Sequence, residues 1–211
     1  LCGSYEAAAK LLLEASGIGP GHEVVTGGLL DARIEAAVNR VGARLVCVDV
    51  DPVHLGPSID ALEHAVTPAT RAVLAGPVDG RTDMLDAVAA ACVRQEVAFV
   101  ELVGAWLGLP AGDRPIGARG WAALMDCGAL CVHGVDRAGG IVTSDTTLTA
   151  EARSRLTSDG PAPCRPSRAS TALLAARLDR LADTAEQCGR AAEAYIRTLA
   201  AAGQLAMGPV R

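Results

Sequence analysis

Apolar residues along the chain repeat with two alternating spacings. In some segments they recur every three or four positions, which is typical of a helix with one buried face; between these lie nearly continuous apolar runs, which are typical of buried strands. This alternation predicts an α/β fold with a mainly parallel sheet covered by helices on both faces, in three αβα layers. The predicted helices cover 4–21, 29–42, 58–71 and 83–96, and the predicted strands cover 22–28, 43–52, 72–80 and 97–104.

The last third of the chain has a different pattern. We expect a single domain in which residues 1–160 form a large α/β part, and 161–211 form a loop and helix that pack on it. Ser4 and Ser58 are predicted helix N-caps, and Gly42 is a predicted helix stop. The later elements are expected at 121–129 and 139–145 (a strand pair), 149–160 (a helix), 161–167 (a proline-rich loop) and 168–203 (one long amphipathic helix).

The composition excludes several classes of function. Half of the 211 residues are apolar, which indicates a folded chain, but aromatic residues make up only 2%, so surfaces for stacking a flat ligand are scarce. The net charge of −5 argues against a nucleic-acid-binding face. No apolar run approaches the roughly 20 residues of a membrane span. Seven scattered cysteines favour reduced thiols and a cytoplasmic location.

Four stretches are informative through their order and spacing. They are "GSYEAAAKLLLEASGIGPGHEV", "AVTPATRAVLAGPVDGRTDML", "PIGARGWAALMDCGALCVHGVDRAGGIVTSD" and "CRPSRASTALLAARLDRLAD". Together they resemble the DegT/DnrJ/EryC1/StrS family of sugar aminotransferases, which are fold-type-I enzymes that use pyridoxal phosphate. The resemblance implies the large domain of that fold, ending in a long helix, without the small C-terminal domain.

The resemblance also places the family's chemical groups on this chain, and most of them are replaced. The lysine that forms the imine with the cofactor falls on Cys131, and the acid that pairs with the pyridine nitrogen falls on Leu102. The His or Gln three positions later falls on Ala105, and the serine that holds the phosphate falls on Asp126. A thiol cannot form that imine, and a carboxylate repels a phosphate, so the usual cofactor chemistry is not expected.

Other parts of the implied site are only partly retained. The aromatic residues that stack on the cofactor ring fall in a segment where Leu29 and Asp31 are found. The Gly3-Ser4 start of the phosphate loop survives, as does the Gly139-Gly140 pair. Ser4 either only caps the first helix or caps it while touching an anion.

Lys10 is the chain's only lysine, so a Schiff-base enzyme would have to use it. We expect Lys10 to lie on the solvated face of the first helix. Arg165 falls where the family keeps an arginine, and either anchors a loop or contacts substrate.

Cysteine and histidine cluster where the lysine would lie. Cys127, Cys131 and His133, with Asp136 nearby, have no fourth ligand in zinc-like spacing, so no metal site is expected. A nucleophilic Cys131 assisted by His133 is one alternative, although no orienting acid or oxyanion donor can be named for it.

These observations lead to one main hypothesis and two alternatives. The main hypothesis is a pseudoenzyme related to amino-sugar biosynthesis, with no cofactor, that acts as a homodimer or as a heterodimer with a full-length aminotransferase. The first alternative is an enzyme, either a transaminase or dehydratase using pyridoxal or pyridoxamine phosphate in a rebuilt site, or a Cys131-based enzyme. The second is a non-catalytic module that binds a sugar nucleotide.

Overall fold

A computed structural model gives the structure of the chain and describes residues 1–78, 80–104, 106, 108–129, 138–158 and 165–203. In chain order the elements are α1 (Tyr5–Ala15), β1 (Glu23–Gly27), α2 (Ala32–Arg40), β2 (Arg44–Val48), α3 (Ile59–Ala65), β3 (Thr70–Ala75), α4 (Leu85–Arg94), β4 (Ala98–Gly104), β5 (Pro110–Ala111), β6 (Arg114–Pro115), β7 (Ala122–Asp126), the 3-10 turn η1 (Cys127–Ala129), β8 (Gly139–Val142), α5 (Thr146–Ser158), α6 (Arg168–Leu178) and α7 (Leu181–Ala201).

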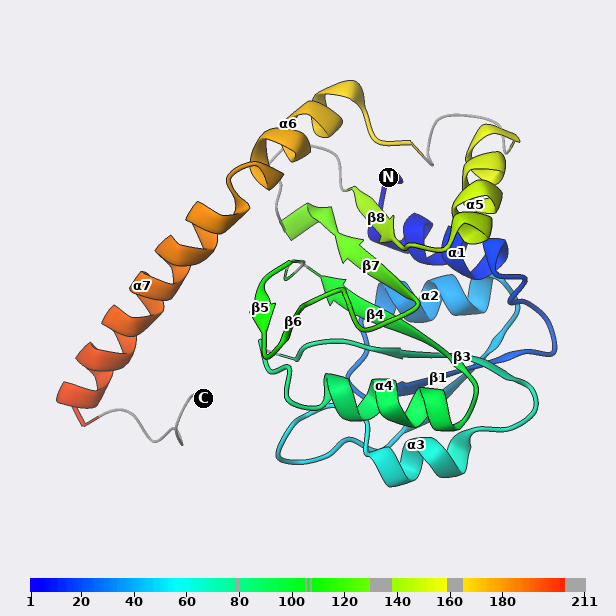
Figure 1. Ribbon diagram of the computed structural model, residues 1–211, viewed down its shortest axis with the longest axis horizontal. Helices are drawn as coiled ribbons and strands as arrows, with labels where there is room; N and C mark the ends of the chain where they lie inside the picture. The colour runs from blue at the N-terminus through cyan, green and yellow to red at the C-terminus, as the bar shows by residue number, and fades with distance from the viewer. Residues whose placement is uncertain (79, 105, 107, 130–137, 159–164, 204–211) are drawn as a thin grey trace. The chain divides into compact units, whose positions relative to one another are not determined.

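Six of the strands form one sheet in the order β2-β1-β3-β4-β7-β8 (Figure 1). The first five strands in that order pair in parallel, and β8 pairs antiparallel to β7. The predicted mainly parallel sheet is therefore confirmed. The late strand pair is confirmed as well, since Leu124 of β7 lies opposite Ile141 of β8.

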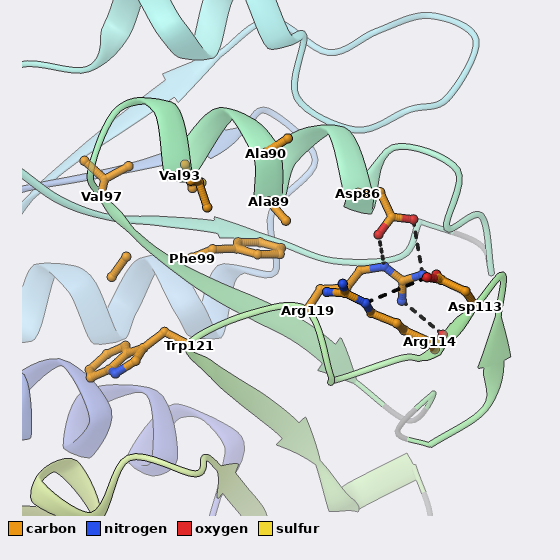
Figure 2. A pocket seen from close by; sticks show the side chains of 12 residues that line it. Asp86, Ala89, Ala90, Val93, Val97, Phe99, Asp113, Arg114, Arg119 and Trp121 are labelled. Carbon is orange, nitrogen blue, oxygen red and sulfur yellow. Dashed lines mark hydrogen bonds and ion pairs between the residues drawn. The ribbon is translucent and has the colours of Figure 1, made fainter.

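Successive strand residues face different helical layers, because side chains alternate across a sheet. Val24 packs in the apolar cluster that includes α1, α2 and α5, and its neighbour Val25 packs in the cluster that includes α3 and α4. In β4, Val100 packs in the first of these clusters and its neighbour Phe99 packs in the second, under α4 (Figure 2). Burial of both faces explains the continuous apolar runs in the sequence, and the three predicted layers are confirmed.

Local signals set the helix ends. Ser4 and Ser58 cap α1 and α3 as predicted, each accepting a backbone N–H, at 3.0 and 3.4 Å. Gly42 has a φ of +75° just past the end of α2, a conformation that suits glycine. The predicted start of the second helix at Leu29 is wrong: α2 begins three residues later, because the carboxylate of Asp31 accepts a backbone N–H at 2.8 Å and acts as its N-cap.

The start of α1 is fixed directly to the sheet. Cys2 exchanges two backbone hydrogen bonds with Gly139, at 2.8 and 3.0 Å. A Cβ at position 139 would lie 2.4 Å from the carbonyl oxygen of Ser4, so only glycine allows this approach. Because Gly139 also pairs with Asp126, the first turn of α1 lies beside the end of β7.

Two features differ from the sequence predictions or were absent from them. The β5–β6 hairpin was not predicted, since each strand has only two residues. The predicted single helix over 168–203 is wrong, because it is divided into α6 and α7 at Asp179 and Arg180. There the N–H of Arg180 bonds to the carbonyl of Arg177, three residues back, which tightens the helix and interrupts it.

Contacts group the chain into two units, Leu1–Leu174 and Ala175–Arg211. The first holds the sheet and the apolar clusters, and the second holds α7. The domain boundary expected after residue 160 stays a prediction. Within the described ranges, no helix is both long enough and apolar enough to cross a membrane.

Candidate functional site

Three segments meet at the carboxyl end of β7. This strand ends at Asp126, α1 begins at Tyr5, and α2 begins after its cap Asp31. The carboxyl ends of parallel strands are where α/β sheets place their ligand sites. The sequence-predicted residues Ser4 and Asp126 therefore lie where a functional site is expected.

Ser4 uses its polar groups within α1. Its Oγ accepts the N–H of Ala7 at 3.0 Å, and its carbonyl accepts the N–H of Ala8 at 3.0 Å. Gly3 lies in the bend just before this cap. The capping role of Ser4 is confirmed, and an anion contact by Gly3 and Ser4 stays a prediction.

Asp126 is a largely buried carboxylate with two partners. Its side chain is only 14% exposed. Oδ1 accepts the backbone N–H of Gly128 at 2.9 Å, and Oδ2 accepts Nη2 of Arg33 at 2.7 Å. Since a buried charge must be paired to be tolerated, these two donors account for the presence of Asp126 at this position.

Arg33 links two carboxylates across the site. Besides bonding Asp126, its Nε and Nη2 donate to the two oxygens of Asp31 at 3.0 and 2.6 Å, a bidentate arrangement. The guanidinium also lies over the ring of Tyr5, 5.0 Å from the ring centroid. We call Tyr5, Asp31, Arg33 and Asp126 the arginine bridge.

Electrostatic effects within the arginine bridge agree with this geometry. Hydrogen bonds from Arg33 hold the pKa of the Asp31 carboxyl below its ordinary value. The pKa of Arg33 is raised, first by Asp31 and then by Asp126. Burial, followed by the charges of Asp31 and Asp126, raises the pKa of the Tyr5 hydroxyl. Arg33 therefore stays charged, and Tyr5 stays neutral.

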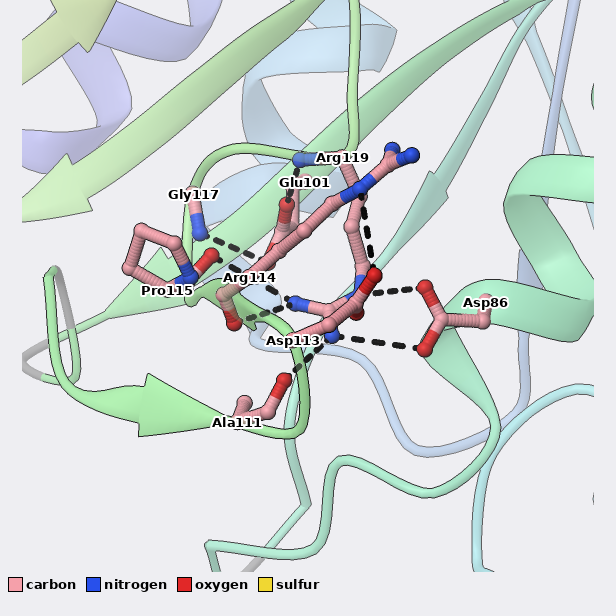
Figure 3. Close-up of polar contacts among 8 residues, drawn as sticks. All are labelled: Asp86, Glu101, Ala111, Asp113, Arg114, Pro115, Gly117 and Arg119. Carbon is pink, nitrogen blue, oxygen red and sulfur yellow. Dashed lines mark hydrogen bonds and ion pairs between the residues drawn. The ribbon is translucent and has the colours of Figure 1, made fainter.

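The end of β4 presents no acid on the α1–α2 side of the sheet. Leu102 packs partly buried against the apolar cluster on that side. Its neighbour Glu101 lies on the other face and is fully buried, with its carboxylate accepting the N–H groups of Gly117 and Arg119 at 2.8 and 3.0 Å (Figure 3). The carboxylate of Glu101 thus holds a loop.

The remaining sequence-predicted residues do not join this site. Lys10 forms an ion pair with Glu14 at 2.8 Å on the solvent side of α1, as expected. Arg165 donates to the carbonyl of Leu156 at 3.2 Å, which agrees with a loop anchor. Leu29 is 58% exposed. Cys131, His133, Asp136 and Ala105 lie outside the described residues. Among those that are described, no cluster of three or more His, Cys, Asp or Glu could hold a metal ion.

Arg33 is the important residue that the sequence analysis missed. It lies 93 residues from Asp126 along the chain, so no local pattern connects the two. One signal was available: an acidic residue at a buried strand end needs a cationic partner, and a positively charged residue in the first turn of a helix is unusual.

Comparison with known proteins gives consistent matches. A sequence model of the DegT/DnrJ/EryC1/StrS aminotransferase family matches residues 2–210. A pleiotropic regulatory protein of Geobacillus stearothermophilus is 30% identical over 153 residues, which are 72% of this chain and 41% of that protein. An L-glutamine:2-deoxy-scyllo-inosose aminotransferase of Micromonospora echinospora is 32% identical over 157 residues, which are 74% of this chain and 37% of that enzyme.

Among solved structures, S. venezuelae DesV in complex with a ketimine intermediate superimposes with a TM-score of 0.72 at 27% identity. That match covers 86% of this chain and 52% of DesV. The chain therefore spans less than half of the curated relatives and about half of this structural relative.

Proposed function

The chain belongs to the DegT/DnrJ/EryC1/StrS aminotransferase family, and from that premise we propose that it is a non-catalytic member which acts by pairing with a second subunit. The observation that carries the proposal is the arginine bridge. Asp126 stands where the family resemblance places a phosphate-binding serine, and Arg33 has become its counter-ion.

The residues of the site do not fit pyridoxal phosphate, the cofactor of the family. A phosphate needs N–H donors and positive charge, yet the Gly128 N–H and the Arg33 Nη2 already donate to the Asp126 carboxylate. The carboxylate would also repel the phosphate at short range. Binding of the cofactor would therefore require the ion pair to open first.

Two further observations support a loss of catalysis. Leu102, at the position of the acid that pairs with the cofactor ring, is apolar and cannot stabilise a protonated ring nitrogen. The only lysine in the sequence, Lys10, is paired with Glu14 on α1. One of the matching relatives is named a pleiotropic regulatory protein, and this name favours a regulatory role for the chain.

The proposal is tested by mixing the purified protein with pyridoxal phosphate, reducing with borohydride and measuring the intact mass. We expect no imine absorbance band and no added mass. A reducible adduct that disappears in the Lys10→Ala variant would mean that the site has been rebuilt around this lysine, and the proposal would be wrong.

The character of α7 supports the pairing part of the proposal. Its five charged residues recur at alternating spacings of three and four, which places them on one stripe of the helix, and no residue of the helix is buried. Outside that stripe the helix is uncharged and includes the exposed side chains of Tyr195, Ile196 and Leu199. The stripe consists of Asp183, Glu186, Arg190, Glu193 and Arg197. A wide uncharged face of this kind favours burial against another surface.

Sedimentation velocity tests the pairing. We expect a dimer for the native sequence and a monomer when Tyr195 and Leu199 are both replaced by glutamate, because the introduced charges would be buried. Arg197→Glu, on the charged stripe, serves as the matched control and should remain dimeric. A native chain that is monomeric at high concentration would contradict self-association.

A further inference from the structure

A groove of 590 Å³ lies between α4 and the segment that leads into β7 (Figure 2). Phe99 at the start of β4 and Cys92 of α4 line it, and both are buried. Val93 forms one wall and is 78% exposed, while Trp121 lies on the opposite wall. Because β4 and β7 begin here, the groove is at the opposite end of these strands from Asp126, and it is separate from the arginine bridge.

One wall of the groove is held in a fixed shape by Arg119, whose side chain is 1% exposed. All five of its N–H donors are used (Figure 3). Nε and Nη2 bond the carboxylate of Asp86 at 2.7 and 3.3 Å, Nη2 also bonds the carbonyl of Ala111, and Nη1 bonds the carbonyls of Arg114 and Pro115 at 3.2 and 3.4 Å. The wall is therefore preorganised, and Arg119 has no donor left for a ligand.

The charges available to a ligand belong to two adjacent residues at one end of the groove. Asp113 and Arg114 are 78% and 58% exposed, and their nearest charged atoms are 3.9 Å apart. Neither side chain makes a hydrogen bond to any other described residue. Since Asp86 is neutralised by Arg119, this end of the groove presents Arg114 and Asp113 as an exposed, loosely held ion pair, which a ligand carrying both charges could exchange for its own contacts.

We propose that this groove binds a free amino acid with an aromatic or branched apolar side chain. The ligand's carboxylate would pair with Arg114 and its ammonium with Asp113, while its side chain covers Phe99 between Val93 and Trp121. A ligand with a single charge would be attracted by one of Asp113 and Arg114 and repelled by the other. A zwitterion can pair its carboxylate with Arg114 and its ammonium with Asp113. The volume is within the range of small-molecule sites, which combine apolar walls with a few polar groups.

Isothermal titration with L-phenylalanine and L-leucine tests the proposal, which does not depend on the proposed loss of catalysis. We expect a dissociation constant of about 1 mM or tighter for at least one of them. Two probes separate the parts of the head group: 3-phenylpropionate lacks the ammonium and phenethylamine lacks the carboxylate. Each should bind roughly tenfold more weakly than L-phenylalanine.

Surface variants connect the binding to the groove. Arg114→Gln should weaken L-phenylalanine about tenfold without changing phenethylamine, and Val93→Asp should abolish binding of both. Val53→Asp and Arg40→Gln change similarly exposed residues outside the groove and should bind as the native chain does. Absence of binding by both amino acids, or binding that Val93→Asp leaves unchanged, would overturn the proposal.

Discussion

Replacing Arg33 with methionine is expected to lower the free energy of unfolding by about 2–3 kcal/mol. The substitution keeps the length of the side chain but leaves Asp126, which is 14% exposed, without its cation. Loss of one partner from a fully buried pair typically costs about 3–5 kcal/mol, and the expected value is smaller because Arg33 itself is 37% exposed. Chemical denaturation monitored by circular dichroism measures the difference.

The destabilisation should depend on pH. The pKa of Asp31 is lowered in the folded chain by Arg33, so this carboxyl contributes stability above its unfolded pKa of about 3.9, and the contribution is lost as the pH falls through the folded value. The difference between the native chain and Arg33→Met should therefore be largest near neutral pH and should shrink at lower pH.

Two controls make the Arg33 result specific. Adding Asp126→Ser to Arg33→Met removes the stranded carboxylate and should recover most of the lost stability, which a double-mutant cycle quantifies. Arg40→Met, on the same helix, breaks an ion pair with Glu6 in which the arginine is 65% and the glutamate 28% exposed, so it should cost less than Arg33→Met, about 1 kcal/mol. Equal losses for Arg33→Met and Arg40→Met would show that the arginine bridge has no special role.

Replacing Glu101 with alanine is expected to cost about 3–5 kcal/mol, the largest effect of any substitution considered. The side chain is fully buried, and its carboxylate accepts the N–H groups of Gly117 and Arg119. Alanine leaves both N–H groups without an acceptor and also leaves a cavity. The loss of the hydrogen bonds and the cavity each lower the free energy of unfolding. Glu101→Gln should cost less, because its amide retains one acceptor oxygen.

Thermal and denaturant unfolding measure these losses, and Glu63→Ala provides the matched control. Glu63 pairs with Arg94 at the surface, so its loss should cost less than about 1 kcal/mol. If Glu101→Ala were no more destabilising than Glu63→Ala, the loop over 117–119 would have to be held by other contacts.

The fold could be predicted from the sequence because the central strands β1, β3, β4 and β7 are largely buried on both faces, and the helices α1 to α4 each bury one face. Val24 and Val25, for example, pack into opposite layers, which produces the apolar run that signals the strand. The β5–β6 hairpin could not be predicted in this way, since two-residue strands show no period. The break at Arg180 depends on local hydrogen bonding inside a segment whose composition is helical throughout.

The candidate site was only partly predictable. The family resemblance pointed to positions 126 and 102 through the order and spacing of residues along the chain. It gave no reason to connect Asp126 with Arg33, since their contact arises only when α2 and β7 are brought to the same end of the sheet. The hydrogen bonds of Arg119 could not be predicted for the same reason. They connect Asp86 of α4 with Ala111 of the β5–β6 hairpin, which the apolar pattern did not indicate.

The two backbone hydrogen bonds between Cys2 and Gly139 affect the order in which the chain acquires its structure during synthesis. The strand that anchors α1 and the α5 residues that cover it, such as Leu148, are made more than a hundred residues after the helix itself. Such a contact, distant in sequence, can form only after the later segment has been made, so the apolar face of α1 stays partly uncovered until then.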